Sequence, residues 1–338
     1  MADSLMPENG SVLGVVVIGR NEGERLRHCL ASVRKTECPL VYVDSGSSDG
    51  SIALARSFGA DVVELDPARP FSAARARNEG HAHLIARWPQ IRFVQFVDGD
   101  CILLEGWLDA AVAALEEQSA RAAVIGHLLE RNADASQYNR LCALEWKSRP
   151  GDLANFGSLI GIAAIRSDVL RQVGGYNPDV IAGEDSELGV RMGLAGYTVT
   201  KIDREMAIHD ANMTTFNQWW RRAVRSGHAI GQRAHLNGRS VYKDCMHERN
   251  STVFWGIGLP LAIVATVVPT HGLSLIALGG YAVLALRIWR GRRRAGDSSA
   301  DALLYTKFVI LAKFAQAVGL LRFFANRLAH RYEIIEYK

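Results

Sequence analysis

Short apolar runs alternate with segments of helical spacing along the first third of the chain. The runs at residues 12–18, 40–43, 61–65 and 91–97 are rich in valine and isoleucine and have the length of buried strands. Between them, residues 22–33, 48–58 and 73–88 repeat apolar positions every three or four residues, as helices do. Strands that alternate with helices in this way predict an α/β fold with a mostly parallel sheet and helices on both of its faces.

The last third of the chain has a different pattern. After predicted helices at 188–195 and 216–235 come two nearly charge-free apolar runs, residues 252–268 and 272–286. Each run is close to the lower length limit for crossing a bilayer, so the pair predicts a helical hairpin that spans a membrane, lies at its surface or is buried in protein. A third apolar segment, residues 303–324, carries polar side chains on several helical faces, which favours a helix in the membrane plane or packed on protein.

Composition narrows the class of protein. Of the 338 residues, 49% are hydrophobic and 22% are charged, which excludes a disordered chain. The five cysteines form no CxxC pair, which argues against a disulfide framework or a zinc ribbon and suits a reducing cytosol. The polar first residues do not resemble a secretory signal.

The net charge of +4 is unevenly distributed. Residues 287–338 contain 11 lysines and arginines against 4 acidic residues, and the arginine cluster directly follows the apolar runs. Under the positive-inside rule this arrangement predicts a protein of the inner membrane whose N-terminal domain faces the cytoplasm. Membrane lipids, and no nucleic acid, are the partners that it predicts for this end of the chain.

Polar residues follow the predicted strands, where parallel sheets bind their ligands. Arg20, Asn21 and Glu22 come after the first strand, and Asp44 ends the second. Neither a Walker A loop nor a G-x-G-x-x-G motif is present at the first turn, which disfavours a P-loop or a dinucleotide site.

The sequence Asp98-Gly99-Asp100 ends the fourth strand. On an extended chain, side chains two residues apart point the same way, so the two carboxylates of Asp98 and Asp100 can meet one cation. Oxygen ligands of this kind suit Mn²⁺ or Mg²⁺. The alternative is a polar turn without a ligand.

Three further groups each allow a structural and a functional interpretation. Glu184 and Asp185 open a helix, either as acidic complements of its N-terminus or with one of them as a general base. His209 is a structural histidine or a Mn²⁺ ligand. The third group is basic and aromatic. Its members could bind a diphosphate or a lipid headgroup, or they could be solvated or packed on the domain; they are Arg77, Trp220, Arg221 and Arg222.

Taken in order, these segments resemble the family 2 glycosyltransferases with a GT-A fold. The resemblance covers about residues 12–235 and rests on five segments in the family's order. They are VVVIGRNEGERLRHCLASV, VYVDSGSSDGS, SAARARNEG, QFVDGD with the DxD motif, and AIRSDVLRQVGGYNPDVIAGEDSELGVRMGLAGY with the ED motif.

The resemblance implies a role for each candidate residue. Around the nucleotide base and ribose it places Arg20, Asn21, Glu22 and Asp44, with Arg77 near the nucleotide or phosphate. It assigns the donor and its metal, Mn²⁺ or Mg²⁺, to Asp98 and Asp100, with His209 as a further ligand. Asp185 becomes the base for the acceptor hydroxyl, and Glu184, Trp220, Arg221 and Arg222 lie on the acceptor or diphosphate side.

Two departures from the family pattern matter. Ile18-Gly19-Arg20 stands where Pro-Thr-Tyr is frequent, so the nucleotide base stays open, with UDP favoured over GDP. Only part of the Gln-x-x-Arg-Trp motif of processive members survives between Gln218 and Arg222, and the membrane region is small. The incomplete motif and the small membrane region favour transfer of a single sugar.

These observations together predict an inverting glycosyltransferase that moves one sugar from a nucleotide-diphosphate sugar to a lipid-linked or glycan hydroxyl, in polysaccharide or glycoconjugate biosynthesis. The alternatives are a processive polysaccharide synthase, a nucleotidyltransferase and a non-catalytic nucleotide-binding membrane protein; a homo-oligomer is left open. The expected organisation is a polar tail (1–11), a GT-A domain (12–235), a connector (236–251), an apolar hairpin (252–289) and a basic amphipathic helical segment (290–338).

Overall fold

The computed structural model describes residues 11–329, so most of the predicted tail at 1–11 and the end of the segment at 290–338 lie outside the described residues. The chain forms two compact units. Of the described residues, the first contains 11–131, 146–179 and 183–211. The second contains 132–145, 180–182 and 212–329.

The first unit is built on a mixed sheet with the strand order β3-β2-β1-β4-β8-β6-β9-β5, and β7 pairs with β9. The strands β1, β2, β3 and β4 pair in parallel, as the alternating pattern predicts. Beyond β4 the sheet is mixed, because β8 runs antiparallel to both β4 and β6 while β6 and β9 are parallel. The strands are β1 (Leu13–Gly19), β2 (Leu40–Asp44), β3 (Asp61–Glu64), β4 (Phe93–Asp98), β5 (Cys101–Leu103), β6 (Arg121–Glu130), β7 (Gly151–Asp152), β8 (Ala164–Arg166) and β9 (Thr198–His209).

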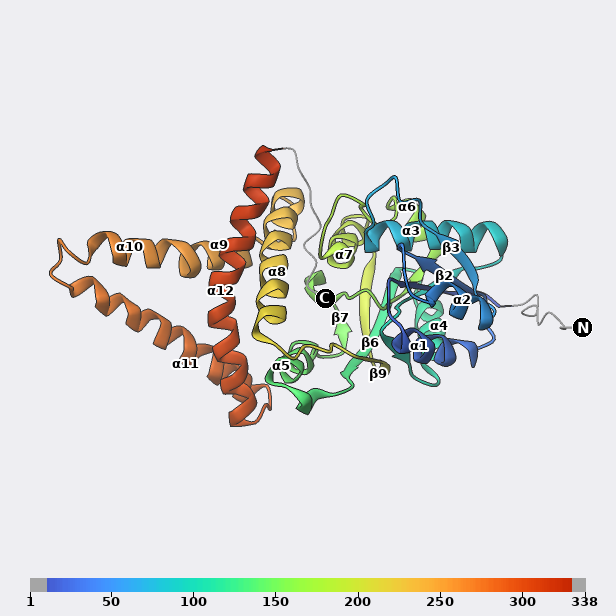
Figure 1. The fold of residues 1–338 in the computed structure, drawn as a ribbon, viewed down its shortest axis with the longest axis horizontal. Coiled ribbons are helices and arrows are strands. Elements are labelled where there is room, and N and C mark those ends of the chain that lie inside the picture. The colour runs from blue at the N-terminus through green and yellow to red at the C-terminus, as the bar shows by residue number, and fades with distance from the viewer. Residues whose placement is uncertain (1–10, 330–338) are drawn as a thin grey trace, which may run out of the picture. The chain divides into compact units, whose positions relative to one another are not determined.

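Helices cover both faces of this sheet. Figure 1 shows α3 on one face and α1 and α4 on the other; for α1 and α3, right-handed crossovers in the strand order β3-β2-β1-β4 require opposite faces. The valines of β1 are fully buried between these layers. The helices of this unit are α1 (Glu24–Arg34), α2 (Ser51–Ser57), α3 (Ala73–Arg87), α4 (Trp107–Glu117), α6 (Ser167–Gln172) and α7 (Glu184–Leu194).

The second unit is helical. Its long helices α8 (Phe216–Asn237) and α12 (Ser299–Leu328) pack side by side, and α5 (Gln137–Glu145) touches α12 through the rings of Tyr138 and Phe308. By packing, α8 therefore groups with the C-terminal helices, whereas the sequence boundary at residue 235 stays a prediction.

A helical hairpin extends from this pair (Figure 1). It consists of α9 (Met246–Val253), a π-helical turn (Phe254–Gly258), α10 (Leu259–Thr266), a 3₁₀ segment (Leu273–Leu278) and α11 (Gly279–Arg294). Its apolar side chains are largely uncovered: Val264 is 71% exposed, Val268 81% and Ile276 75%. Exposure of so many apolar side chains to water is unfavourable, and it is typical of a surface that contacts lipid or another apolar partner.

Two stretches of the described chain are long and apolar enough to cross a membrane, Leu273–Arg294 and Ser299–Leu328. The apolar window of the first is not buried in protein, while a third of the second is. Leu320 and Phe323 of α12 are buried where it packs on α8, so this helix is at least partly protein-packed.

Candidate active site

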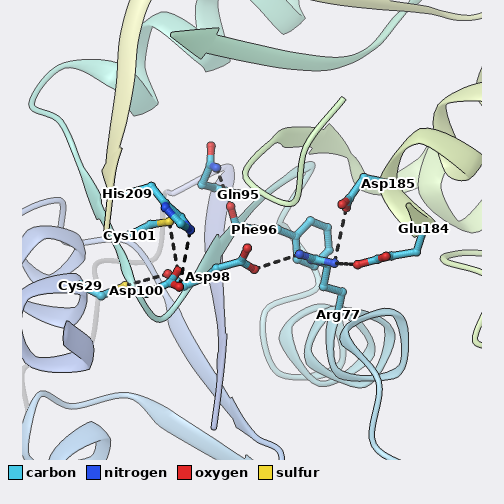
Figure 2. A network of polar contacts seen from close by, with 10 residues as sticks. All are labelled: Cys29, Arg77, Gln95, Phe96, Asp98, Asp100, Cys101, Glu184, Asp185 and His209. Carbon is cyan, nitrogen blue, oxygen red and sulfur yellow. Dashed lines mark hydrogen bonds and ion pairs between the residues drawn. The ribbon is translucent and has the colours of Figure 1, made fainter. Parts of the chain in front are cut away.

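The turn between β4 and β5 separates the two carboxylates of the DxD sequence. Residues 99 and 100 form a turn, so the alternation of an extended chain ends at Asp98. The Asp98 carboxylate points towards Arg77, and that of Asp100 points towards His209 (Figure 2). Asp98 is 36% exposed at its side chain and Asp100 only 3%, so the two acids occupy different environments.

Asp100 belongs to a compact group of possible metal ligands. Antiparallel pairing of β5 with β9 sets Cys101 opposite His209, and ligand atoms of Asp100, Cys101 and His209 all lie within 4.8 Å of one another. His209 Nε2 is 3.5 Å from Asp100 Oδ2, and its Nδ1 is 3.8 Å from a carboxylate oxygen of the buried Glu130. The ring of Trp146 packs edge-on against the imidazole at 4.8 Å.

The donor set of this group fits a divalent cation. The Nε2 atom of His209 faces Asp100, so it is the imidazole nitrogen placed to share a cation with that carboxylate. Burial and the neighbouring Asp100 raise the pKa of the Cys101 thiol well above its usual value. Carboxylate and imidazole are a combination that suits Mn²⁺ better than Mg²⁺, and a cysteine thiolate is the preferred ligand of softer ions than either.

Arg77 lies at the centre of a second charged group. Its guanidinium, on the buried face of α3, donates to Asp98 Oδ1 at 2.9 Å and to Glu184 Oε1 at 2.8 Å, and it is 3.4 Å from Asp185 Oδ1. It also lies 5.4 Å from the centre of the Tyr176 ring. The Arg77 guanidinium therefore connects the end of β4 with the first turn of α7, and three carboxylates share it (Figure 2).

Asp185 is a buried acid of this group with a raised pKa. Its side chain is 13% exposed, and its Oδ1 accepts no hydrogen bond from any described residue. Burial raises the pKa of Asp185 to about 8; Arg77 opposes this shift, and the charges of Glu184 and Asp98 add to it. A carboxylate with a pKa in this range can accept a proton near neutral pH, as a general base must.

The backbone next to Arg77 leaves room for it only because residue 161 is glycine. A Cβ atom at Gly161 would lie 2.1 Å from Arg77 Nη2 and 3.0 Å from Asp98 Oδ2. The neighbouring residue Asn78 exchanges two 2.8 Å hydrogen bonds with the backbone of Tyr176, which holds the segment before α7 against α3.

The loops after β1 and β2 form the other side of this sheet edge. Asp44 is 2% exposed and accepts hydrogen bonds from the backbone of Gly46 and Ser47 and from the Tyr42 hydroxyl. Asn21 Oδ1 accepts from the Ser48 backbone at 2.7 Å, so the two loops are joined. Asn21 has φ 54°, a left-handed conformation that asparagine tolerates.

Arg20 and Glu22 flank Asn21 in the same loop. The Arg20 guanidinium stacks over the Phe71 ring, and Glu22 pairs with Arg25 at 2.8 Å. The structure thus brings together at one edge of the first unit all the predicted residues that belong to that unit.

Trp220, Arg221 and Arg222 belong to the second unit, and their predicted role towards acceptor or diphosphate stays a prediction. Trp220 stacks with Phe216 at 5.8 Å, and Arg222 pairs with Glu145 at 2.7 Å. Both contacts lie within that unit.

Sequence reasoning missed several members of the site. Strand pairing and chain reversals bring these members to the predicted residues; they are Glu130, Cys101, Trp146, Gly161 and Tyr176. Cys101, next to Asp100, offered the one local signal. The link between Arg77 and the Glu184-Asp185 pair joins residues more than a hundred positions apart and left no local pattern.

Comparison with known proteins agrees with this geometry. Residues 14–169, which include β1, β2 and the DxD turn, match the model of Glycosyl transferase family 2. Residues 14–169 therefore form a domain similar to those of the family 2 glycosyltransferases.

Two relatives and one solved structure illustrate the likeness. A TPR repeat-containing protein of Synechococcus elongatus is 33% identical over 141 residues, 41% of this chain and 32% of the relative. The pre-mycofactocin glycosyltransferase of Mycobacterium tuberculosis is 28% identical over 305 residues, 86% of this chain and 60% of the relative. The chain thus spans about a third and about 60% of these two proteins.

The mannosyltransferase PcManGT of Pyrobaculum calidifontis, solved with GDP-Man and Mn²⁺, superposes with a TM-score of 0.61 at 21% identity. The superposition covers 93% of this chain and 89% of that structure, and it establishes the GT-A fold.

Proposed function

We propose that this chain is a family 2 glycosyltransferase that moves one sugar from a nucleotide-diphosphate sugar to a hydroxyl acceptor, with inversion, at the cytoplasmic face of the inner membrane. The observation that carries the proposal is the position of Arg77, which joins a buried carboxylate with a raised pKa, Asp185, to the DxD carboxylate Asp98. A base and a donor-binding acid held on one guanidinium are suited to a single displacement between two bound substrates.

In the proposed reaction, Asp185 takes the proton of the acceptor hydroxyl while that oxygen forms a bond to the anomeric carbon. The bond from this carbon to the diphosphate oxygen breaks on the opposite face, and the nucleoside diphosphate leaves with the electron pair. Asp185 then returns its proton to solvent. Arg77 orients Asp185 and offsets the charge that Glu184 places beside it.

Asp100 and His209 are the residues proposed to hold the cation, with Mn²⁺ preferred over Mg²⁺. A divalent cation at this position supplies charge neutralisation for the departing diphosphate. Asp98 is proposed to hold the donor rather than the ion, because its carboxylate is engaged by Arg77.

The nucleotide is proposed to bind where the loops of Arg20, Asn21, Glu22 and Asp44 meet, at the carboxyl ends of β1 and β2. The base stays open between UDP and GDP: the sequence favours UDP, and PcManGT was solved with GDP-Man.

The acceptor is proposed to be lipid-linked or a membrane-proximal glycan, because the uncovered hairpin would keep the enzyme at a bilayer. Transfer of one sugar is favoured over processive synthesis. The side chain of Gln218, a remnant of the processive motif, caps α8 and accepts from the backbone of Thr214 and Thr215 at 2.9 and 3.0 Å.

The test is a thermal-shift series on the detergent-solubilised chain with UDP, GDP and their sugars, with and without Mn²⁺. A ligand at a hundred times its dissociation constant stabilises the native state by about 2.7 kcal/mol. We expect Mn²⁺-dependent stabilisation by one nucleotide that is lost in Asp100→Ala and kept in Asp109→Ala, an exposed acid on α4. The absence of any shift in folded wild-type protein would refute a nucleotide-dependent reaction.

A further inference from the structure

Three helices of the second unit form a groove that the proposed reaction does not use. The groove has a volume of about 410 Å³ and lies where α8 ends, α9 begins and α12 ends. Its lining is basic and apolar, and its charged members are Arg239, Arg249 and Arg327, with His235 beside them.

These arginines are not paired with acids in the described part of the chain. Within residues 11–329, no carboxylate lies within salt-bridge distance of any of the three, and Arg249 donates only to the amide oxygen of Asn250. By contrast, the neighbouring buried Arg233 forms a two-point pair with Asp244. Arg239 and Arg327 lie at helix C-termini, where one basic side chain offsets the helix dipole, but three guanidiniums exceed that need.

The groove continues into an apolar hollow. A second space of about 480 Å³ shares Arg249 and Phe324 with the groove and is otherwise lined by Asn250, Val253, Phe254 and Gly258. From Arg249 the chain runs through this hollow into α10, whose Leu261 and Val264 are 62% and 71% exposed. One continuous surface therefore passes from positive charge to the uncovered apolar hairpin.

The groove also lies where the first arm of the hairpin leaves the helix pair. The hairpin leaves with α9, which carries Arg249, and it returns with α11, which leads into the start of α12 (Figure 1). Basic side chains at such a boundary attract anionic headgroups, while apolar side chains beyond it contact acyl chains.

We propose that this groove binds the phosphate headgroup of an anionic membrane lipid, with the lipid chains lying along Val253, Phe254 and α10. The guanidiniums of Arg239, Arg249 and Arg327 would contact the phosphate through charge-assisted hydrogen bonds, which are short and directional. The proposal rests on the membrane association proposed above but not on sugar transfer. It assigns to the second unit a lipid site separate from the residues of the nucleotide-binding edge.

The experiment uses the full chain in dodecyl maltoside, titrated with dioleoyl phosphatidic acid, with dioleoyl phosphatidylcholine as the neutral comparison and native mass spectrometry to count bound lipid. One variant carries Arg239→Gln, Arg249→Gln and Arg327→Gln. The matched control removes three charges from α11 with Arg287→Gln, Arg290→Gln and Arg294→Gln. Nucleotide binding of each variant, followed by thermal shift, is measured in parallel.

We expect saturable binding of one phosphatidic acid, weakened at least about tenfold in the groove variant and little changed in the α11 variant. Equal losses in both variants would show diffuse attraction by the basic surface and overturn the proposal. Equal competition by inorganic phosphate would make the groove a site for free phosphate instead of lipid. Failure of nucleotide binding with intact lipid binding would refute the proposed reaction and leave the lipid site standing.

Discussion

At the scale of single residues, the site depends on one guanidinium shared by three acids. Arg77 is 2% exposed and pairs with Asp98 and Glu184, so its displacement would leave the buried Glu184 carboxylate without its partner and remove the positive charge that opposes the raised pKa of Asp185. The protonation of Asp185 and the orientation of Asp98 are therefore linked through a residue that the sequence assigned only to the nucleotide.

Replacing the proposed base tests its role directly. We expect Asp185→Asn to fold and bind nucleotide but to lose transfer by about 10²–10⁴-fold, because the amide cannot accept the acceptor proton. Asp168→Asn, which changes an exposed acid in the first turn of α6, serves as the control and should keep its rate. Transfer by Asp185→Asn at the wild-type rate would exclude Asp185 as the base.

The raised pKa of Asp185 also sets a pH dependence. Because the base must be ionised and its pKa is about 8, kcat/KM of the wild-type enzyme should increase with pH and level off above that value. The expected slope below it is about tenfold per pH unit. A pH–rate profile measures this, and a flat profile on the acid side of the pKa would contradict it.

Gly161 provides a second test at this scale. In Gly161→Ala the new Cβ would overlap Arg77 Nη2, so we expect the guanidinium to be displaced, stability to fall by about 1–3 kcal/mol and transfer to fall with it. Gly157→Ala is the matched control, because a Cβ there has no neighbour closer than 3.6 Å. The measurements are the unfolding midpoints and the initial transfer rates of both variants. Equal midpoints and rates for the two would mean that the Arg77 side chain can move aside without loss.

At the scale of elements, α8 and α12 are held together by close backbone contact. A Cβ at Gly319 would lie 1.9 Å from the Val224 carbonyl oxygen, and one at Gly227 would lie 2.1 Å from that of Gln316. Each glycine thus admits the backbone of the other helix, and no side chain is present that could move aside.

We therefore expect Gly319→Ala to lower the free energy of unfolding of the second unit by about 1–3 kcal/mol. Gly291→Ala, at a position on α11 where a Cβ would meet nothing within 4 Å, should be neutral or stabilising by up to about 1 kcal/mol through helix propensity. Thermal unfolding in detergent compares the two. If Gly319→Ala unfolded at the same temperature as Gly291→Ala, α8 and α12 could move apart at little cost, and the close backbone contact would not be needed for stability.

At the scale of the whole molecule, the chain combines a GT-A unit with a hairpin whose apolar side chains are largely uncovered by the described residues. Nothing in the sugar-transfer chemistry requires exposed side chains such as Val264 and Ile276. Their exposure is explained if the molecule works at a bilayer, where the same side chains are solvated by lipid.

A charge placed on that surface should weaken membrane attachment. Moving a carboxylate into the bilayer costs about 2.5–3.5 kcal/mol, so we expect Val264→Asp and Ile276→Asp to reduce the vesicle-bound fraction in flotation experiments. Val241→Asp introduces the same charge at a position that is 83% exposed but outside the hairpin, and it should float as the wild type does. Unchanged flotation of all three variants would count against hairpin insertion.

The sequence by itself determined the first half of the sheet and supplied most of the candidate site residues. Runs such as residues 91–97 and the spacing in residues 73–88 are local signals, because burial on both faces and helical periodicity act within a few residues. Asp98 and Asp100 are recognisable for the same reason, since they follow a strand that the pattern marks, whereas the choice of Asp185 over Glu184 came from the resemblance to the family.

Only the tertiary structure decided how these residues work together. The mixed half of the sheet arises from pairings between distant strands such as β8 and β4, for which no short stretch of sequence carries information. The turn at residues 99–100 directs Asp98 to Arg77 and Asp100 to His209, where an extended chain would have pointed both at one ion. The shared guanidinium, the raised pKa of Asp185 and the arginine groove are properties of contacts between segments, and they exist only once the chain has folded.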